Sequence, residues 1–182
     1  PYLQRGTDSG IVIRWATDAP IQGRVWYGTG PEMALTQEEK TITCEHKIEL
    51  QGLTPDTKYH YLVGTNIGVQ EGETIAYFVT APAKLKPVTR PIRIWAVGDA
   101  GRGNDVAAQV QDGYLKFTGA RHTDLWLMLG DNAYESGTLE EYQQGVFDMY
   151  RDFLRNCCLW TAIGNHDAGS ASSLLQTGPY YE

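Results

Sequence analysis

The 182-residue sequence has few cysteines and histidines, no long apolar run and no excess of positive charge. Its three cysteines, Cys44, Cys157 and Cys158, follow no regular spacing, so we expect neither a zinc site nor a disulfide framework. No run of about 18 apolar residues occurs, so we expect no membrane-spanning helix. The formal net charge of −7 disfavours a nucleic-acid partner, because phosphate backbones attract basic surfaces.

The first part of the chain, residues 1–83, is typical of an all-β domain. Short runs rich in Val, Ile, Thr, Tyr and Trp are separated by turn residues, a pattern that favours a β-sandwich. In the first run, Ile11, Ile13 and Trp15 alternate along the chain and are expected to share one face. We expect strands at residues 10–18, 23–30, 45–50, 57–65 and 74–82.

The stretch LTPDTKYHY indicates which kind of β-sandwich to expect. Leu53, Pro55, Thr57 and Tyr59 occupy alternate positions, which is typical of a tyrosine corner. In that motif the tyrosine hydroxyl forms a hydrogen bond with the backbone a few residues upstream. This part of the chain therefore resembles fibronectin type III modules.

The pattern changes after residues 84–91, a stretch with prolines and basic residues that we interpret as a linker. From residue 92 onward strands and helices alternate, which predicts a mainly parallel sheet with helices on its faces. Thr138 and Glu141 fit a capping box at the start of the second helix. A stripe of apolar residues marks the first helix, formed by Ala107, Val110, Tyr114 and Phe117. We expect strands at 92–99, 124–131 and 158–167, and helices at 104–117 and 138–154.

All three of these strands end in polar side chains that could bind a metal ion. Asp99 ends the first, Asp131 ends the second with Tyr134 just beyond it, and Asn165 and His166 lie at the end of the third. Ligands of open α/β sheets bind at the carboxyl ends of the strands, so these side chains should converge. Two carboxylates, a phenol, an amide and an imidazole are costly to assemble unless a cation binds among them.

Other interpretations of the same residues remain open. The segment GDAGRG could be a phosphate-binding loop, but it lacks the Lys-Ser/Thr pair of a P-loop. Asp99 or Asp131, taken singly, could be a turn residue or a helix cap. The matched endings of three strands favour the metal site over these alternatives.

The segments DAG, GDNAY and GNHD, in this order, resemble the first three motif blocks of the purple acid phosphatases. These enzymes belong to the calcineurin-like metallophosphoesterases, and larger members carry a fibronectin-like sandwich before the catalytic domain. The resemblance implies a dinuclear-metal hydrolase of phosphate monoesters in which a metal-bound hydroxide attacks phosphorus. It also implies a secreted, periplasmic or vacuolar location.

The resemblance assigns a role to each candidate residue. Asp99 and Tyr134 would hold Fe(III), and Asp131 would bridge it to a divalent ion, which is Fe, Zn or Mn. Asn165 would bind that second ion. His166 would face the substrate as the catalytic residue that stabilises the phosphoryl oxygens and assists the leaving group.

One departure from the wider superfamily concerns Gly101. Most metallophosphoesterases begin with Asp-x-His, and that histidine is a metal ligand. Gly101 occupies the matching position here, and Tyr134 is similar to the tyrosinate that replaces the imidazole in purple acid phosphatases. Glu135 and Asp167 are close enough in sequence to line the pocket, but the resemblance gives them no role.

Two further blocks of the family, Val-x-x-His and Gly-His-x-His, have no counterpart. The four histidines match neither block; they are His46, His60, His122 and His166. We therefore expect residues 92–182 to be the first half of the α/β metallophosphoesterase domain, truncated after its third motif. A missing C-terminal segment or a second chain would complete the site.

Three other functions stay open at this point. A phosphodiesterase or a nucleotide pyrophosphatase could use the same scaffold. A non-catalytic binding module is an alternative of a different class, in which the sandwich recognises a partner.

Overall fold

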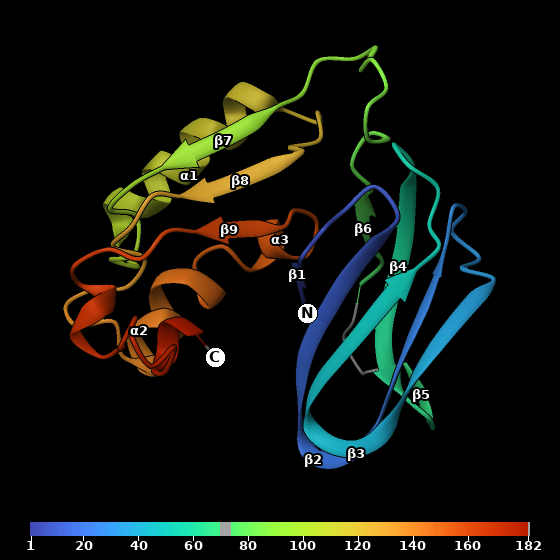
Figure 1. The fold of residues 1–182 in the computed structure, drawn as a ribbon, viewed down its shortest axis with the longest axis horizontal. Helices are drawn as coiled ribbons and strands as arrows, with labels where there is room; N and C mark the ends of the chain where they lie inside the picture. Colours follow the sequence, from blue (N-terminus) through green and yellow to red (C-terminus); the bar gives the residue numbers. More distant parts are fainter. Residues whose placement is uncertain (70–73, 182) are drawn as a thin grey trace. The chain divides into compact units, whose positions relative to one another are not determined.

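A computed structural model describes residues 1–69 and 74–181, which form two compact units (Figure 1). The first unit contains Pro1–Pro91 and Leu154–Cys158, and the second contains Ile92–Phe153 and Leu159–Glu182. The segment Leu154–Cys158 lies in the range expected for the α/β part, but it clusters with the first unit. Within the described residues, no helix has the length and apolar character needed to cross a membrane.

The first unit is an antiparallel sheet that encloses its own core. The long strand β2 pairs with β1 through its first half, with β4 through its last residues, and with β3 in both halves. Strand β4 also pairs with β5 and β6. The strands are β1 (Tyr2–Gln4), β2 (Gly10–Gly28), β3 (Leu35–Gln51), β4 (Lys58–Thr65), β5 (Gly68–Val69) and β6 (Ala76–Val79).

The expectation of separate strands at 10–18 and 23–30 was wrong. The two segments belong to one strand, β2, whose pairing with β3 shifts register between Ala16 and Ile21 and again between Gln22 and Arg24. Such irregularities bend a strand while its pairing continues, so the polar and proline residues near position 20 do not end it.

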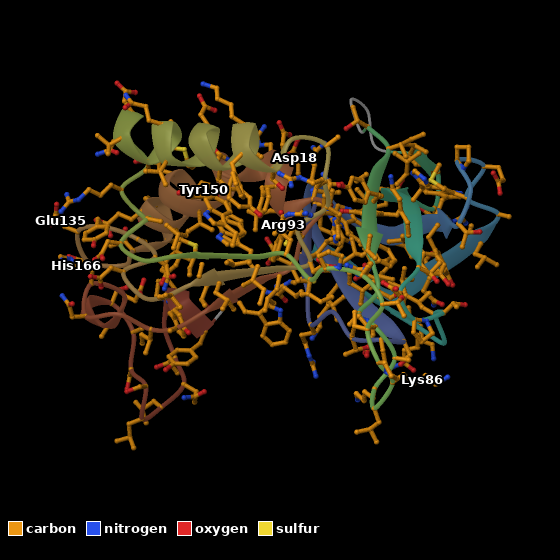
Figure 2. The ribbon with its side chains drawn as sticks, turned by 90° about the horizontal axis from the view of Figure 1, so that it is seen from above. Asp18, Lys86, Arg93, Glu135, Tyr150 and His166 are labelled. Carbon is orange, nitrogen blue, oxygen red and sulfur yellow. The ribbon has the colours of Figure 1, made fainter. Side chains whose placement is uncertain are left out.

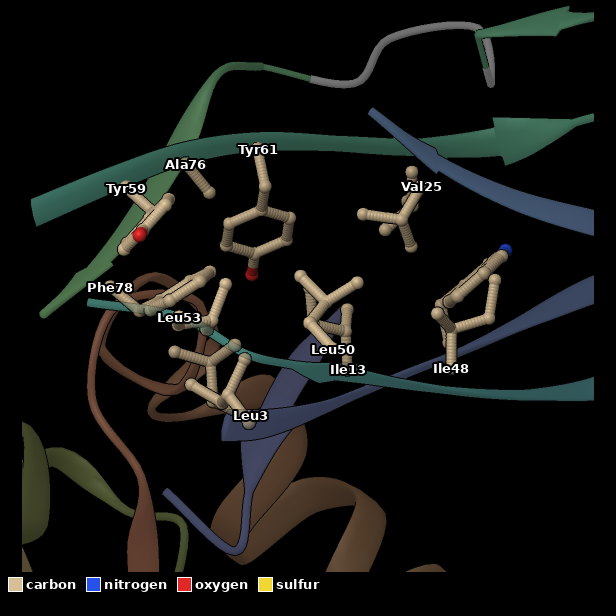
Figure 3. Packing of buried hydrophobic residues seen from close by; sticks show 13 residues of the cluster. Leu3, Ile13, Val25, Ile48, Leu50, Leu53, Tyr59, Tyr61, Ala76 and Phe78 are labelled. Atoms are coloured by element: carbon tan, nitrogen blue, oxygen red, sulfur yellow. The ribbon is translucent and has the colours of Figure 1, made fainter. Parts of the chain in front are cut away.

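The core of this unit confirms the alternation in the sequence. Ile11, Ile13 and Trp15 are all buried in one cluster. Figure 3 shows side chains from β4 and β6, among them Tyr61 and Phe78, facing those of the other strands across this core. Period-two alternation places residues on one face of a strand, which is why this part of the prediction holds.

The tyrosine corner is also confirmed. The backbone N–H of Thr54 donates to the Tyr59 hydroxyl at 3.0 Å. The segment Leu154–Cys158 satisfies further polar groups of the same unit. Its Arg155 carbonyl accepts from the Tyr61 hydroxyl at 2.8 Å, and Asn156 Oδ1 accepts from the backbone N–H of Tyr77 at 2.9 Å.

The second unit contains the expected parallel sheet, in the strand order β7-β8-β9. Its strands are β7 (Ile94–Val97), β8 (Leu125–Met128) and β9 (Leu159–Thr161), and α1 (Asp105–Thr118) joins the first two. The predicted helix 138–154 divides into α2 (Leu139–Tyr142), a π-helical turn (Gln143–Asp148) and α3 (Arg151–Leu154). The π-turn lies where Gly145 meets Gly101, since a Cβ on Gly145 would lie 2.3 Å from the Gly101 carbonyl oxygen.

Aromatic rings cover one face of this sheet. The rings of Trp95 and Trp126 stack on each other and meet rings from the helices. Tyr114 of α1 stacks on Trp95 with ring centroids 4.3 Å apart. The stripe expected for α1 is wrong at two of its four positions, because Val110 and Phe117 are 49% and 74% exposed.

The opposite face of the sheet presents apolar side chains to solvent. Ile94 of β7 is 53% exposed and Trp160 of β9 is 46% exposed. These positions alternate with the buried tryptophans, so the sheet is covered on one side within the described residues.

The tyrosine corner gives a direct test of the first unit. Tyr59→Phe removes the acceptor of the Thr54 N–H, and we expect the free energy of unfolding to fall by about 1 kcal/mol. Chemical denaturation measures this loss. The control is Tyr27→Phe, a hydroxyl on a partly buried ring of the same unit. Equal losses in the two variants would contradict the role of the corner.

Candidate metal centre

The ends of β7 and β8 place two aspartates side by side. Val97 and Met128 are paired in the parallel register; Asp99 lies two residues after Val97, and Asp131 lies three residues after Met128. Asp99 and Asp131 both adopt left-handed backbone conformations, with φ of 55° and 52°. Aspartate tolerates this region better than most residues, and such outliers cluster at functional sites.

Gly101 has no room for a side chain. A Cβ at this position would lie 2.0 Å from the backbone oxygen of Asn132. The two loops also exchange backbone hydrogen bonds, because the Gly101 N–H donates to the Asp131 carbonyl and the Tyr134 N–H donates to the Gly101 carbonyl, each at 3.3 Å. An imidazole could not be accommodated at position 101 in this packing.

Tyr134 joins the two aspartates. Its hydroxyl lies 2.8 Å from Asp99 Oδ1 and 3.2 Å from Asp131 Oδ2, so three oxygen-bearing side chains meet at one point. Burial raises the pKa of the Tyr134 phenol well above its ordinary value, and Asp99 and Asp131 raise it further. The phenol therefore keeps its proton at neutral pH unless a cation binds to its oxygen.

The third strand contributes His166. Its backbone N–H donates to Asp131 Oδ1 at 3.0 Å, and this bond is the largest cause that holds the pKa of Asp131 below its ordinary value. The rings of His166 and Tyr134 lie 4.3 Å apart. Asn165 precedes it with an exposed side chain, next to Gly164, which lies against the Asp131 backbone.

The structure thus brings Asp99, Asp131, Tyr134 and His166 together, with Asn165 at the adjoining position. Over residues 1–69 and 74–181, no three or more His, Cys, Asp and Glu residues gather as a metal site would require. The donors here are two carboxylates and the phenol of Tyr134, and tyrosine is not among those four residue types. Oxygen donors of this kind fit a hard cation such as Fe(III).

Asp167 is a residue whose importance the sequence did not reveal. Its fully buried carboxylate accepts the backbone N–H of Asn132 at 3.0 Å and the backbone N–H of Gly164 at 2.8 Å. It also accepts from the Asn132 side-chain amide at 2.7 Å and from the Tyr142 hydroxyl. One carboxylate therefore ties the loop after β8 to the loop after β9.

Glu141 has a comparable role for the loop that follows Tyr134. The expected capping box is present, with Glu141 accepting from the Thr138 N–H at 2.9 Å. The same carboxylate accepts the N–H groups of Glu135 and Ser136. The Thr138 N–H is the largest cause that lowers the pKa of Glu141.

Glu135 and Arg102 lie next to the residues of the candidate site. The backbone carbonyl of Glu135 accepts from His166 Nδ1 at 2.6 Å, and Figure 2 shows both residues at the same end of the second unit. The Arg102 guanidinium lies 4.3 Å from the centre of the Tyr134 ring and pairs with the Glu135 carboxylate at 3.0 Å. Nothing in the motif spacing indicated Arg102.

Solved structures with a similar fold include purple acid phosphatase PPD1 and PhoD. Purple acid phosphatase PPD1 from yellow lupin (Lupinus luteus) seeds matches 93% of this chain with a TM-score of 0.71 and 15% identity. PhoD matches 91% of the chain with a TM-score of 0.61 and 14% identity. The fold is purple acid phosphatase-like.

The match covers part of those proteins. This chain spans 38% of the length of each of the two structures. No protein-family model matches the sequence, and a search of curated proteins finds no match either. The similarity therefore concerns the fold.

Replacing Asp167 tests the link between the two loops. Asp167→Asn keeps the shape but sets an amide N–H₂ against N–H and O–H donors. We expect a loss of roughly 3 kcal/mol in the free energy of unfolding and faster hydrogen exchange at Asn132 and Gly164.

The matched control is Asp112→Asn on the exposed side of α1, where we expect a change within about 0.5 kcal/mol. Unaltered exchange at Asn132 and Gly164 in the Asp167 variant would show that the carboxylate does not hold these loops.

Glu141 gives a pH-dependent prediction. Its pKa in the folded protein lies below the ordinary value of 4.5, so its stabilising contribution is complete above pH 4.5 and is lost as pH falls through the folded pKa. We expect Tm to fall in acid, and Glu141→Gln to lower Tm at neutral pH while flattening this dependence. Thermal unfolding across the acid range measures both effects. The exposed control Glu140→Gln should keep the acid dependence of Tm. An equally steep dependence in Glu141→Gln would refute the assignment to Glu141.

Proposed function

We propose that this chain carries half of the dinuclear metal site of a phosphate-monoester hydrolase of the acid phosphatase type. The observation that carries the proposal is the contact of the Tyr134 hydroxyl with both Asp99 and Asp131. The exclusion of any side chain at Gly101 supports it, because the phenol then takes the place of an imidazole ligand. The purple acid phosphatase-like fold is a second support.

The residues divide between two ions. Asp99 and Tyr134 would hold Fe(III), Asp131 would be shared, and Asn165 would bind a divalent ion of Fe, Zn or Mn. When bound, the metal pair supplies Lewis acidity to the phosphoryl group and makes water a nucleophile near neutral pH or below. Both aspartates lie past the strand ends in left-handed backbone conformations, and both carboxylates accept from the Tyr134 hydroxyl.

His166 acts on the substrate. Its Nδ1 is engaged by the Glu135 carbonyl, so Nε2 is the ring atom available to a phosphoryl oxygen or to the leaving group. A protonated imidazole there would donate to those oxygens as negative charge develops on them. Asp131 accepts from the backbone of the same residue, which links the position of the ring to that of the shared ligand.

The two half-sites on this chain are unequal. Three residues would bind the first ion, and only Asp131 and Asn165 would bind the second. Histidines supplied by further sequence or by a second chain would complete both. The chain by itself should therefore bind one ferric ion, bind a second metal poorly and hydrolyse phosphate esters little or not at all.

Iron binding tests the proposal directly. Titration of the chain with Fe(III) should produce a visible charge-transfer band from the tyrosinate, at a stoichiometry near one ion per chain. Tyr134→Phe should abolish the band, and Asp99→Ala or Asp131→Ala should weaken iron binding by at least about tenfold, since each removes a charged ligand.

Tyr181→Phe, a tyrosine near the end of the same unit, is the matched control and should retain the band. A band that persists in Tyr134→Phe, or iron affinity that is equal in all variants, would overturn the assignment. Robust hydrolysis of a phosphate monoester by the 182-residue chain would contradict the claim that the site is half complete.

A further inference from the structure

The hydrogen bond of His166 determines which ring nitrogen carries the proton. His166 Nδ1 lies 2.6 Å from the backbone oxygen of Glu135. A carbonyl oxygen only accepts hydrogen bonds, so Nδ1 must be the donor. In the neutral ring the proton therefore resides on Nδ1, and Nε2 keeps its lone pair.

The Glu135 carbonyl is held in place by another residue. The N–H groups of Glu135 and Ser136 both donate to the Glu141 carboxylate, the second at 3.0 Å. The Thr138 N–H donates to it at 2.9 Å. One carboxylate thus accepts three backbone donors from the loop that presents the Glu135 carbonyl.

This loop is also packed closely against the chain that carries His166. Gly137, with φ of 69°, approaches so closely that a Cβ would lie 2.8 Å from Asp167 Cα. The Ser170 hydroxyl donates to the Gly137 carbonyl. Displacement of the loop would therefore alter the distance between the Glu135 carbonyl and the imidazole.

We propose that Glu141 is a positioning residue that sets the tautomer of His166 through the Glu135 carbonyl. Glu141 thereby has two roles: it caps α2, and it positions the carbonyl that contacts the imidazole. The role of Nε2 as the atom that faces the phosphoryl group rests on the proposed function. The tautomer itself does not.

The charge on Glu141 suits this role. Its backbone donors lower the pKa of the carboxyl group, so it stays ionised in mild acid. An ionised carboxylate offers acceptor oxygens only, as three N–H donors require. Glutamine offers one oxygen, which is enough for a capping box but not for all three donors.

The test is ¹⁵N NMR of the His166 ring in the metal-free chain, at a pH where the ring is neutral. The wild-type protein should show the Nδ1–H tautomer as the dominant form. Glu141→Gln should lose this dominance and show a mixture of both tautomers. Glu140→Gln, the exposed neighbour, should resemble the wild type.

Thr138→Ala separates the helix cap from the loop. It removes the hydroxyl that caps α2 but keeps the backbone N–H that donates to Glu141. The Nδ1–H tautomer should persist in this variant. A shift as large as that in Glu141→Gln would assign the effect to the helix end and overturn the proposal.

Two other results would also overturn it: dominance of the Nε2–H tautomer in the wild type, or an unchanged tautomer in Glu141→Gln. These outcomes are independent of iron binding. A chain that binds no metal still reports the tautomer, so failure of the proposed function and failure of this inference can be told apart.

Discussion

The buried carboxylate of Asp167 is the interaction on which the candidate site depends. Loops that leave the ends of parallel strands lose the hydrogen-bond partners of the sheet, and their N–H groups need new acceptors. Asp167 supplies one acceptor group to Asn132 and Gly164, in the loops after β8 and β9. The neighbours of these two residues, Asp131 and Asn165, are thereby kept at a set separation.

Four carboxylates at the candidate site fall into two groups with different roles. Asp167 and Glu141 are saturated by backbone donors, and they shape the loops. Asp99 and Asp131 accept from the Tyr134 phenol, whose proton a cation would replace in the proposed metal site. Because the loops are already held by the first group, the second group can keep its charge available at the surface of the site.

Tyr134 resolves a conflict that two adjacent carboxylates create. Like charges on two carboxylates that meet at one hydroxyl repel each other. The phenol proton is shared with Asp99 and Asp131 and reduces that repulsion in the metal-free protein. Burial and the same two carboxylates raise the pKa of Tyr134, so the phenol keeps its proton at neutral pH in the absence of a cation. Gly101 makes the arrangement possible by leaving its space to the Asn132 backbone.

Local patterns in the sequence predicted the segments that form β2, β4, β6 and the last part of β3, and the tyrosine corner at Tyr59. They also predicted a parallel sheet from β7, β8 and β9, with Gly-Asp endings on the first two. Each depends on the spacing of neighbouring residues, which the chain states directly. Tertiary structure decided the bend of β2, the division of the helix after Thr138 and the inclusion of Leu154–Cys158 in the first unit. It also decided that the Asp167 carboxylate contacts the loops after β8 and β9 and that the Glu135 carbonyl contacts the His166 ring. These features arise where loops from different strands meet, and no local spacing encodes which backbone donor will find which acceptor.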